Sequence, residues 1–353
     1  MIKNNLIIKK IVVLLVLATV FFLIGCDEDP RVTYFNLRPI DDEFMLDNLD
    51  QAEASPHMEY WIGYQFGVGP LDLELAPDEH FYGVIELDDA TDYFVAHIGI
   101  IASHDFHFVF KVFINYEEVA FRVRGEEEYA LEFVLPLESG YQVNIPFTID
   151  VESSEENATY KLAAGLFLVD SNQVINEENH DSFTMGFALN HDLIFGLGSD
   201  INFEPKPNAT ILSREEATNF IAIYITPELT LNEYGNRARP ELKMQVRRGE
   251  EIELFFDTTH QPLYGYELEN YLFIGLLNGQ QARLNHAPFL FVDFGEHGFN
   301  NITDTGSFIL DPIDEVGYYD FIVISVLNPK KRNSLINSFP PFISNRIIIE
   351  VIE

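Results

Sequence analysis

The segment FVFKVFINYEEVAFRV, residues 108–123, indicates the fold class of this chain. Phenylalanine and β-branched residues recur with a period of two on both sides of Asn115-Tyr116-Glu117-Glu118, and not with the period of a helix. Such side chains fit the pleated, half-buried surface of a sheet. The segment therefore predicts two strands joined by a hairpin turn.

Strands of the same composition are predicted along most of the chain after residue 57. In the first half they cover residues 129–135, 141–151, 160–169, 183–189 and 191–195. In the second half they cover residues 220–225, 241–246, 251–256, 271–277, 281–285, 289–293, 308–310, 319–327 and 347–352. Asn278-Gly279 predicts a type I′ hairpin turn, because both central residues of that turn need positive φ. Short strands at this spacing predict sandwiches or barrels.

Residues 198–210 interrupt the pattern of strands. Glu204-Pro205-Lys206-Pro207-Asn208 cannot lie inside a sheet, since proline lacks the amide hydrogen that a strand donates. Ser213-Arg214-Glu215-Glu216 has the form of a capping box and predicts a short helix. The length of 353 residues also fits about two folded domains. We therefore predict an all-β protein with two tandem β-sandwich domains, residues 58–205 and 206–353.

The two halves share short sequence motifs. Arg124-Gly125-Glu126-Glu127 is similar to Arg248-Gly249-Glu250-Glu251, and Gly165-Leu166-Phe167 is similar to Gly275-Leu276-Leu277. The spacing between the motifs differs from one half to the other. The shared motifs have two possible explanations, an internal duplication of one domain or the sequence composition that β-sandwiches have in common.

A more specific motif lies in the second half, at residues 315–319. It reads Glu-Val-Gly-Tyr-Tyr and leads into an alternating strand. This motif resembles the tyrosine corner of immunoglobulin-like domains, which implies that the Tyr319 hydroxyl bonds to upstream backbone just before strand F. Glu138-Ser139-Gly140-Tyr141-Gln142 is a degraded counterpart in the first half. By this analogy we predict sandwiches of the immunoglobulin-like or fibronectin-like kind.

The first 25 residues have the composition of a signal peptide. Three lysines precede an uncharged run over residues 11–23, which is shorter than a membrane-spanning helix. The run ends in Leu23-Ile24-Gly25-Cys26, which resembles the lipobox of bacterial lipoproteins. The resemblance implies cleavage before Cys26, the chain's only cysteine, and its modification by lipid. The alternatives are an ordinary secretory signal and an uncleaved membrane helix.

The chain is strongly acidic, and the predicted cleavage makes it more so. It has 21 Lys and Arg residues against 57 Asp and Glu residues, a formal net charge of −36. Removal of residues 1–25 leaves 18 basic residues against 57 acidic ones, a net charge of −39. This charge disfavours nucleic acid as a partner. Anionic headgroups repel it within a Debye length, about 8–10 Å.

Residues 26–57 are therefore predicted to form an acidic tether between a lipid anchor and the folded body. The body would lie in the cell envelope, on the extracytoplasmic side of a membrane. Asp27-Glu28-Asp29 resembles the acidic sorting signals that follow the lipidated cysteine in some bacterial lipoproteins. Retention at the inner membrane, export to the cell surface and a plain solvated tether all remain open.

The sequence predicts no catalytic residue and no metal site. It contains no GxSxG, HExxH, P-loop or GxGxxG pattern, and lipidation would consume the thiol of Cys26. His104 and His107 would point to opposite faces of a strand, which leaves too few ligands for zinc. Carboxylates at Asp88, Asp89 and Asp92 or over residues 293–301 could bind calcium, but the sequence does not place such a site. We expect no cofactor beyond the covalent lipid.

Three other groups of residues are candidate surface features. Tyr60-Trp61-Ile62-Gly63-Tyr64 could stack on sugars, although alternating Trp and Tyr residues more often belong to a core. Lys330-Lys331-Arg332 is expected to contact the protein's own acidic surface in preference to an anionic partner. Histidines beside Asn or Asp, at residues 179–181, 190–192 and 285–286, are expected near turns.

The sequence therefore predicts a lipid-anchored envelope protein that acts as a non-catalytic binding or scaffold component. Its partners would be the membrane, through the lipid, and a protein or glycan that the sequence does not identify. One alternative is a carbohydrate-binding surface lipoprotein that uses residues 60–64. Another is an envelope hydrolase, which would need two carboxylates facing each other in a cleft.

Overall fold

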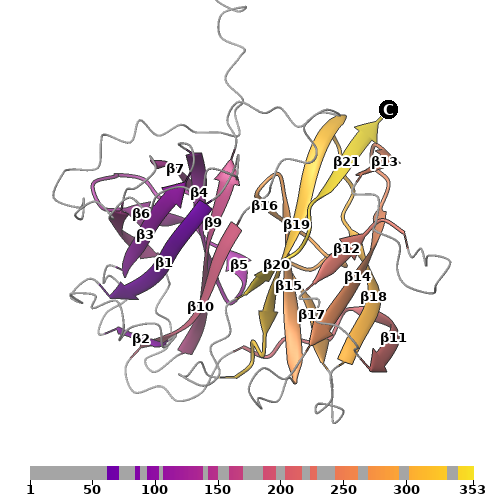
Figure 1. Cartoon of the computed structure of the whole chain (residues 1–353), viewed down its shortest axis with the longest axis horizontal. Coiled ribbons are helices and arrows are strands. Elements are labelled where there is room, and N and C mark those ends of the chain that lie inside the picture. The colour runs from indigo at the N-terminus through magenta and orange to yellow at the C-terminus, as the bar shows by residue number, and fades with distance from the viewer. Residues whose placement is uncertain are drawn as a thin grey trace, which may run out of the picture. The chain divides into compact units, whose positions relative to one another are not determined.

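The described residues of the chain form β-strands and no helix. The computed structural model describes residues 62–70, 84–87, 94–102, 106–137, 142–149, 159–169, 186–195, 203–216, 223–228, 243–260, 269–293, 302–331 and 341–353. All regular structure in these ranges is strand (Figure 1). None of these ranges offers a helix that is long and apolar enough to cross a membrane. The prediction of an all-β fold is confirmed.

The strands between residues 62 and 195 form the two sheets of a first sandwich. The smaller sheet has the order β1 (Ile62–Pro70), β3 (Phe94–Ala102), β8 (Gln142–Ile149) and β6 (Phe121–Val123). The larger sheet has the order β2 (Val84–Leu87), β10 (Gly186–Phe195), β9 (Thr159–Val169), β4 (Phe106–Ile114) and β5 (Glu117–Glu118), and β7 (Glu132–Leu137) also pairs with β4. Aromatic rings from both sheets pack at centroid distances of 4.9 to 5.8 Å in the core, namely Phe94, Phe110, Phe121, Phe133 and Phe147.

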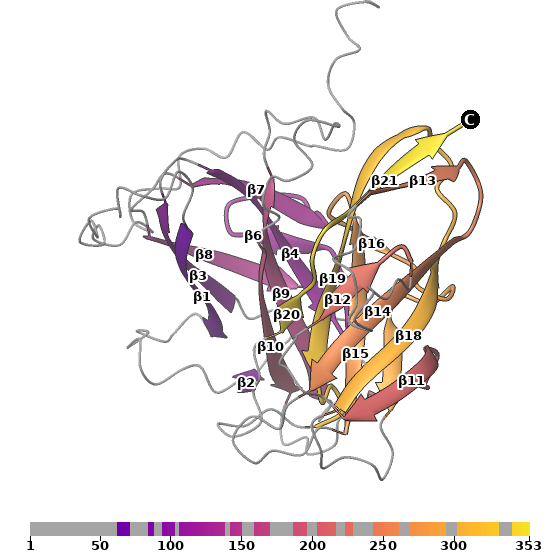
Figure 2. The same ribbon diagram turned by 45° about the vertical axis from the view of Figure 1, so that its right-hand side comes forward.

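The strands between residues 210 and 352 form a second sandwich. Its smaller sheet has the order β11 (Thr210–Glu216), β18 (Ile302–Leu310), β14 (Ile252–His260) and β12 (Tyr224–Thr226), which run side by side in Figure 2. Its larger sheet has the order β13 (Lys243–Arg247), β21 (Ile347–Ile352), β19 (Gly317–Leu327), β15 (Asn270–Leu277) and β16 (Gln280–Ala282). Two short strands complete it, β17 (Leu290–Asp293) beside β15 and β20 (Phe342–Ile343) beside β19. The core contains Phe256, Phe273, Phe308 and Phe321.

The two sandwiches share the order of most of their strands. Strands β1, β3 and β8 correspond to β12, β14 and β18, and strands β2, β10, β9, β4 and β5 correspond to β13, β21, β19, β15 and β16. Each larger sheet begins with a parallel pair, β2 with β10 or β13 with β21. The fourth strand of the smaller sheet differs, because β6 comes from within the first sandwich whereas β11 comes from the segment before β12. Tandem β-sandwiches are therefore what the chain forms.

The tyrosine corner predicted in the second half is present. Tyr319 is the third residue of β19, its ring is buried, and its hydroxyl donates a hydrogen bond to the Glu315 carbonyl oxygen at 3.0 Å. The predicted counterpart of this corner at residues 138–142 is wrong, because the motif ends at Gln142, the first residue of β8. Strand β8 corresponds to β18, whereas β19 corresponds to β9.

The predicted hairpin at residues 108–123 is half right. Strands β4 and β5 pair around a turn in which Asn115 and Tyr116 have φ of 49° and 67°. After Glu118 the chain leaves this sheet, and β6 pairs with β8 in the opposite sheet. The second predicted turn is confirmed, since Asn278 and Gly279 have φ of 48° and 77° between β15 and β16.

The helix predicted at residues 213–216 is wrong. This segment lies in β11, which pairs with β18 from Thr210 opposite Ser307 to Glu216 opposite Ile302. A capping box is a local signal, and pairing with a long neighbouring strand overrides it. The turn expected at residues 190–192 is also wrong, because β10 runs unbroken from Gly186 to Phe195.

The short motifs shared between the halves do not occupy equivalent positions. Gly125 follows β6, whereas Gly249 lies between β13 and β14. Gly165 lies in β9 and Gly275 in β15, but β9 corresponds to β19 and β15 to β4. Both Gly125 and Gly249 have positive φ, 98° and 75°, so the first pair of motifs reports a common kind of turn and not a common place in the fold.

Candidate functional site: the contact between the two sandwiches

Two neighbouring strands of the second sandwich, β15 and β19, are apolar on both faces. Their inward residues belong to the core of that sandwich, for example Phe273 and Phe321. Their alternate residues belong to a separate buried cluster, namely Leu272, Ile274, Leu276, Ile322, Ile324 and Val326. Side chains alternate between the faces of a strand. The almost wholly apolar runs YLFIGLL and FIVISVL therefore reflect burial on both faces.

The first sandwich and the segment after it cover this outer face. Phe113, Ala163 and Phe167 from β4 and β9 belong to the same cluster as the six residues of β15 and β19. A Cβ atom at Gly165 would overlap the Phe167 ring, so the glycine leaves room for that ring. Phe203, from the segment that joins the sandwiches, is also a member. We call this cluster and the polar bonds around it the inter-sandwich contact.

Tyr116 explains an unusual turn at the edge of the inter-sandwich contact. A non-glycine residue with φ of 67° is uncommon, and Tyr116 has no small polar side chain to favour it. Its ring is fully buried and lies 5.1 Å from the Phe203 ring, which in turn lies 5.7 Å from Phe289. The turn thus places an aromatic ring where the linking segment crosses to the second sandwich.

A reciprocal pair of hydrogen bonds joins the short strands β5 and β16. The Glu118 amide donates to Oε1 of Gln281 at 2.7 Å, and the Gln281 amide donates to Oε2 of Glu118 at 3.1 Å. The side-chain amide of Gln281 also donates to the carbonyl oxygens of Tyr116, at 2.8 Å, and Pro288, at 2.9 Å. These bonds satisfy backbone groups that strand pairing leaves free at the edges of both sheets.

Two buried lysines of the first sandwich lie at the inter-sandwich contact. Lys111 Nζ lies 2.5 Å from Glu118 and 2.7 Å from Glu132. Lys161 Nζ lies 2.6 Å from Asp192, both side chains are fully buried, and Lys161 also donates to the carbonyl oxygen of Lys331 in the second half. Burial lowers the pKa of Lys161, and the Asp192 carboxylate partly opposes that shift. The Lys161 ammonium therefore depends on these acceptors.

The second sandwich has a half-buried ion pair in which the acidic residue, and not the basic one, lies on the central strand. Asp320 in β19 lies 3.2 Å from Nε of Arg346, just before β21. Burial raises the pKa of Asp320, and the Arg346 guanidinium and backbone amides partly oppose that shift. The two pairs are placed alike. Lys161 near the start of β9 pairs with Asp192 on the adjacent β10, and Asp320 near the start of β19 pairs with Arg346 just before the adjacent β21.

Asn208 fixes the segment that joins the sandwiches. Its side-chain amide donates to the Phe289 carbonyl at 3.0 Å, and its Oδ1 accepts from the Phe291 amide at 2.6 Å. Its backbone bonds to the Phe291 carbonyl and to the side chain of Asn285. Asn285 in turn accepts from the Ile309 amide at 2.7 Å. The linking segment is therefore hydrogen-bonded to β17 directly, and to β18 through Asn285, before β11 begins.

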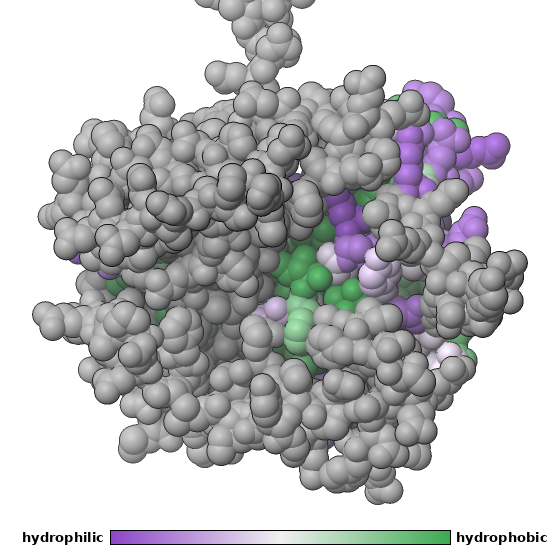
Figure 3. Space-filling view, in the orientation of Figure 1, coloured by the Kyte–Doolittle hydropathy of each residue, from purple (hydrophilic) through white to green (hydrophobic). Residues whose placement is uncertain are grey.

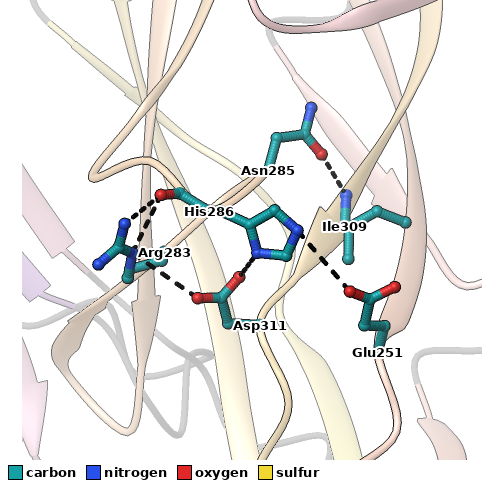
Figure 4. A network of polar contacts seen from close by, with 6 residues as sticks. All are labelled: Glu251, Arg283, Asn285, His286, Ile309 and Asp311. Atoms are coloured by element: carbon teal, nitrogen blue, oxygen red, sulfur yellow. Dashed lines mark hydrogen bonds and ion pairs between the residues drawn. The ribbon is translucent and has the colours of Figure 1, made fainter.

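The turn at Asn285-His286 carries a polar network on the surface (Figure 4). His286 Nδ1 lies 2.8 Å from Asp311, and Nε2 lies 3.7 Å from Glu251. Arg283 donates to the His286 carbonyl oxygen and lies 3.7 Å from Asp311. The turn expected at residues 285–286 is confirmed, with φ of 51° and 61°. Because the His286 side chain is 64% exposed, these pairs contribute little to stability.

The basic triplet at residues 330–332 contacts acidic side chains of the protein, as expected. Lys330 lies 3.6 Å from Glu204, and Lys331 lies 2.8 Å from Glu269. Arg332 lies outside the described residues. Elsewhere, Figure 3 shows hydrophilic residues around β13 and the C-terminal end of β21, where Arg247, Arg248 and Glu250 are exposed.

Several predicted site residues lie outside the described residues. These are Cys26, the tether, Tyr60, Trp61, Asp88, Asp89, Asp92, His104, Asp105, residues 179–181 and residues 294–301. The lipid anchor, the sugar platform and the calcium site therefore stay predictions. Over the ranges that the structure does describe, no three or more His, Cys, Asp or Glu side chains gather as metal ligands would.

The inter-sandwich contact is not among the features that the sequence predicts. The turn expected at residues 190–192 includes Asp192, yet this residue is the fully buried partner of Lys161. Two signals could have found the contact. One is the lysine within each apolar run of the first sandwich, Lys111 and Lys161. The other is the almost wholly apolar character of residues 271–277 and 321–327, which a sheet with one solvated face does not need.

Comparisons with known proteins do not extend this picture. No family model matches the chain, and no curated protein matches it either. The C-terminal domain of the Streptococcus agalactiae AgI/II polypeptide BspA is 11% identical with a TM-score of 0.23, covering 80% of this chain and 99% of its own. The C-terminal domain of the Streptococcus pyogenes antigen I/II-family protein AspA is 10% identical with a TM-score of 0.22, covering 82% and 99%.

A third solved structure comes from the pre-assembly complex of the chaperone CsuC and the tip adhesion subunit CsuE of Acinetobacter baumannii Csu pili. It is 12% identical with a TM-score of 0.21, covering 82% of this chain and 100% of its own. TM-scores this low carry no argument about what this chain binds. The fold assignment therefore rests on the strand pairing.

Proposed function

We propose that this chain is a lipid-anchored, non-catalytic scaffold or binding protein of the bacterial cell envelope. The observation that carries the proposal is the inter-sandwich contact. It covers the outer face of β15 and β19 with residues of the first sandwich, and polar bonds from Glu118, Gln281 and Lys161 surround it. Two sandwiches joined by these contacts would together present a ligand-binding surface.

The use made of buried charge supports a non-catalytic role. The described buried lysines and Asp320 each bond to a counter-ion on or beside an adjacent strand. Lys111 and Lys161 also link, through Glu118 and the Lys331 carbonyl, to the second half. Catalytic groups need access to substrate, whereas these groups lie inside strand pairings. Their chemistry is that of a structural contact.

The lipobox and the charge of the chain support the proposed location. Two or three acyl chains at Cys26 would hold the protein permanently at a membrane, whereas one chain holds only marginally. A body with a net charge near −39 after cleavage would stay away from anionic headgroups. The proposed partners are the membrane lipid, through the anchor, and an extracytoplasmic protein or glycan, but not nucleic acid.

Replacement of the lipidated cysteine tests the anchor. We expect Cys26→Ala to move the full-length chain from the membrane fraction to the soluble or secreted fraction, because no acyl chain can then be attached. Fractionation followed by immunoblotting measures this, and Ser55→Ala in the tether is the control that should leave the protein in the membrane. An unchanged distribution of a Cys26→Ala chain whose signal peptide has been removed would refute lipidation at this residue.

A further inference from the structure

The residues Glu118 and Gln281 occupy the same place in the two sandwiches. Each lies in the short strand that follows the turn at the end of β4 or β15. In the first sandwich the Lys161 amide donates to Asn115 Oδ1 at 3.0 Å, and in the second the Asp320 amide donates to Asn278 Oδ1 at 2.9 Å. Aligned on these turns, residue 118 corresponds to residue 281. Each residue of this equivalent pair therefore makes the same bond to the other, as in a contact with local two-fold symmetry.

A contact built on equivalent faces could form in more than one way. The face of β4 and β9 could meet that of β15 and β19, as it does here, or either face could meet its own copy on another molecule. The faces are not chemically equal, however. Lys111 stands where the second sandwich has Ile274, and Lys161 stands where it has Asp320. The first face therefore carries two lysines at positions where the second face has one apolar residue and one carboxylate.

The charges around Glu118 disfavour a pairing of two first faces. Lys111 lies between the carboxylates of Glu118 and Glu132, so the group carries one net negative charge. A second copy would bring another such group against it at the edge of an apolar contact. Like charges placed opposite each other in a contact are strongly unfavourable. Gln281 brings no charge to this place.

Gln281 also does what a glutamate could not do. Its Oε1 accepts from the Glu118 amide while its Nε2 donates to the carbonyl oxygens of Tyr116 and Pro288. A carboxylate can accept the first bond but cannot donate the other two. The combination of one carboxylate and one carboxamide therefore matches the donors and acceptors that the structure brings to this position.

We propose that Glu118 and Gln281 are the specificity-determining pair of the inter-sandwich contact. They select the face of β4 and β9 for the face of β15 and β19, and they exclude a second copy of the face of β4 and β9. This inference deepens the proposed scaffold role and rests on the same contact, but it does not depend on the lipid anchor.

A double-mutant cycle in the full-length chain with Cys26→Ala tests the pair. Urea unfolding followed by circular dichroism gives the unfolding equilibrium constant of each variant. We expect Gln281→Glu to raise this constant at least about tenfold more than Gln281→Met, because only the glutamate adds a like charge. Glu118→Gln should raise the constant in the parent chain, where it takes a partner from Lys111, but lower it about tenfold in the Gln281→Glu chain.

The direction in which Glu118→Gln changes the unfolding constant of the Gln281→Glu chain decides whether the proposal holds. Two positions that do not interact would give Glu118→Gln the same effect in both backgrounds. Equal effects, or equal losses for Gln281→Glu and Gln281→Met, would overturn the proposal. Because every chain in the cycle lacks Cys26, the result is independent of whether the membrane fractionation supports the anchor.

Discussion

At the scale of single residues, the Lys161–Asp192 pair is a fully buried ion pair beside the contact. Both side chains are fully buried with Nζ and Oδ1 at 2.6 Å. We expect Asp192→Asn to lower the free energy of unfolding by about 3 kcal/mol, because removal of one partner leaves a buried charge. Urea unfolding measures this. Glu204→Gln, which breaks an exposed pair with Lys330, is the matched control and should change it by less than about 0.5 kcal/mol.

The pH dependence of the same variant gives a second readout. Burial lowers the pKa of Lys161, and loss of the Asp192 charge lowers it further. Above that pKa the unfolded chain binds more protons at this lysine than the native chain does, so stability rises with pH. The deficit of Asp192→Asn should therefore shrink as pH rises through the lowered pKa toward 10.5, the ordinary value. A deficit that is constant with pH would show that the lysine charge is not its cause.

At the scale of elements, the segment from Phe203 to β11 joins the two sandwiches through packed and hydrogen-bonded residues. It buries Phe203, bonds through Asn208 to β17, and then supplies the edge strand of the second sandwich. We expect Asn208→Ala to destabilise the chain by about 2 kcal/mol, since it leaves the Phe289 carbonyl and Phe291 amide without their partner. Lys206→Ala, exposed in the same segment, should be neutral in the same urea unfolding measurement.

At the scale of the whole molecule, the contact should make the two sandwiches unfold together. Domains that share a large apolar contact open in one cooperative unit, whereas loosely joined domains unfold separately. We expect one calorimetric transition for the Cys26→Ala chain and two after Ile274→Asp, which puts a charge in the middle of the contact. Leu131→Asp, at an exposed leucine of the first sandwich, should keep one transition. Two transitions in the parent chain would contradict the single body.

Local sequence patterns were enough to specify the fold class, most strands, the turn at Asn278-Gly279 and the Tyr319 corner. These features depend on local periodicity and on residues whose backbone needs are local. Long-range packing, in contrast, makes residues 213–216 a strand, takes β6 out of the predicted hairpin, and brings Asp192 to Lys161. Each of these outcomes depends on a partner distant in the chain, and a local pattern carries no information about which partner a strand edge or a buried charge will find.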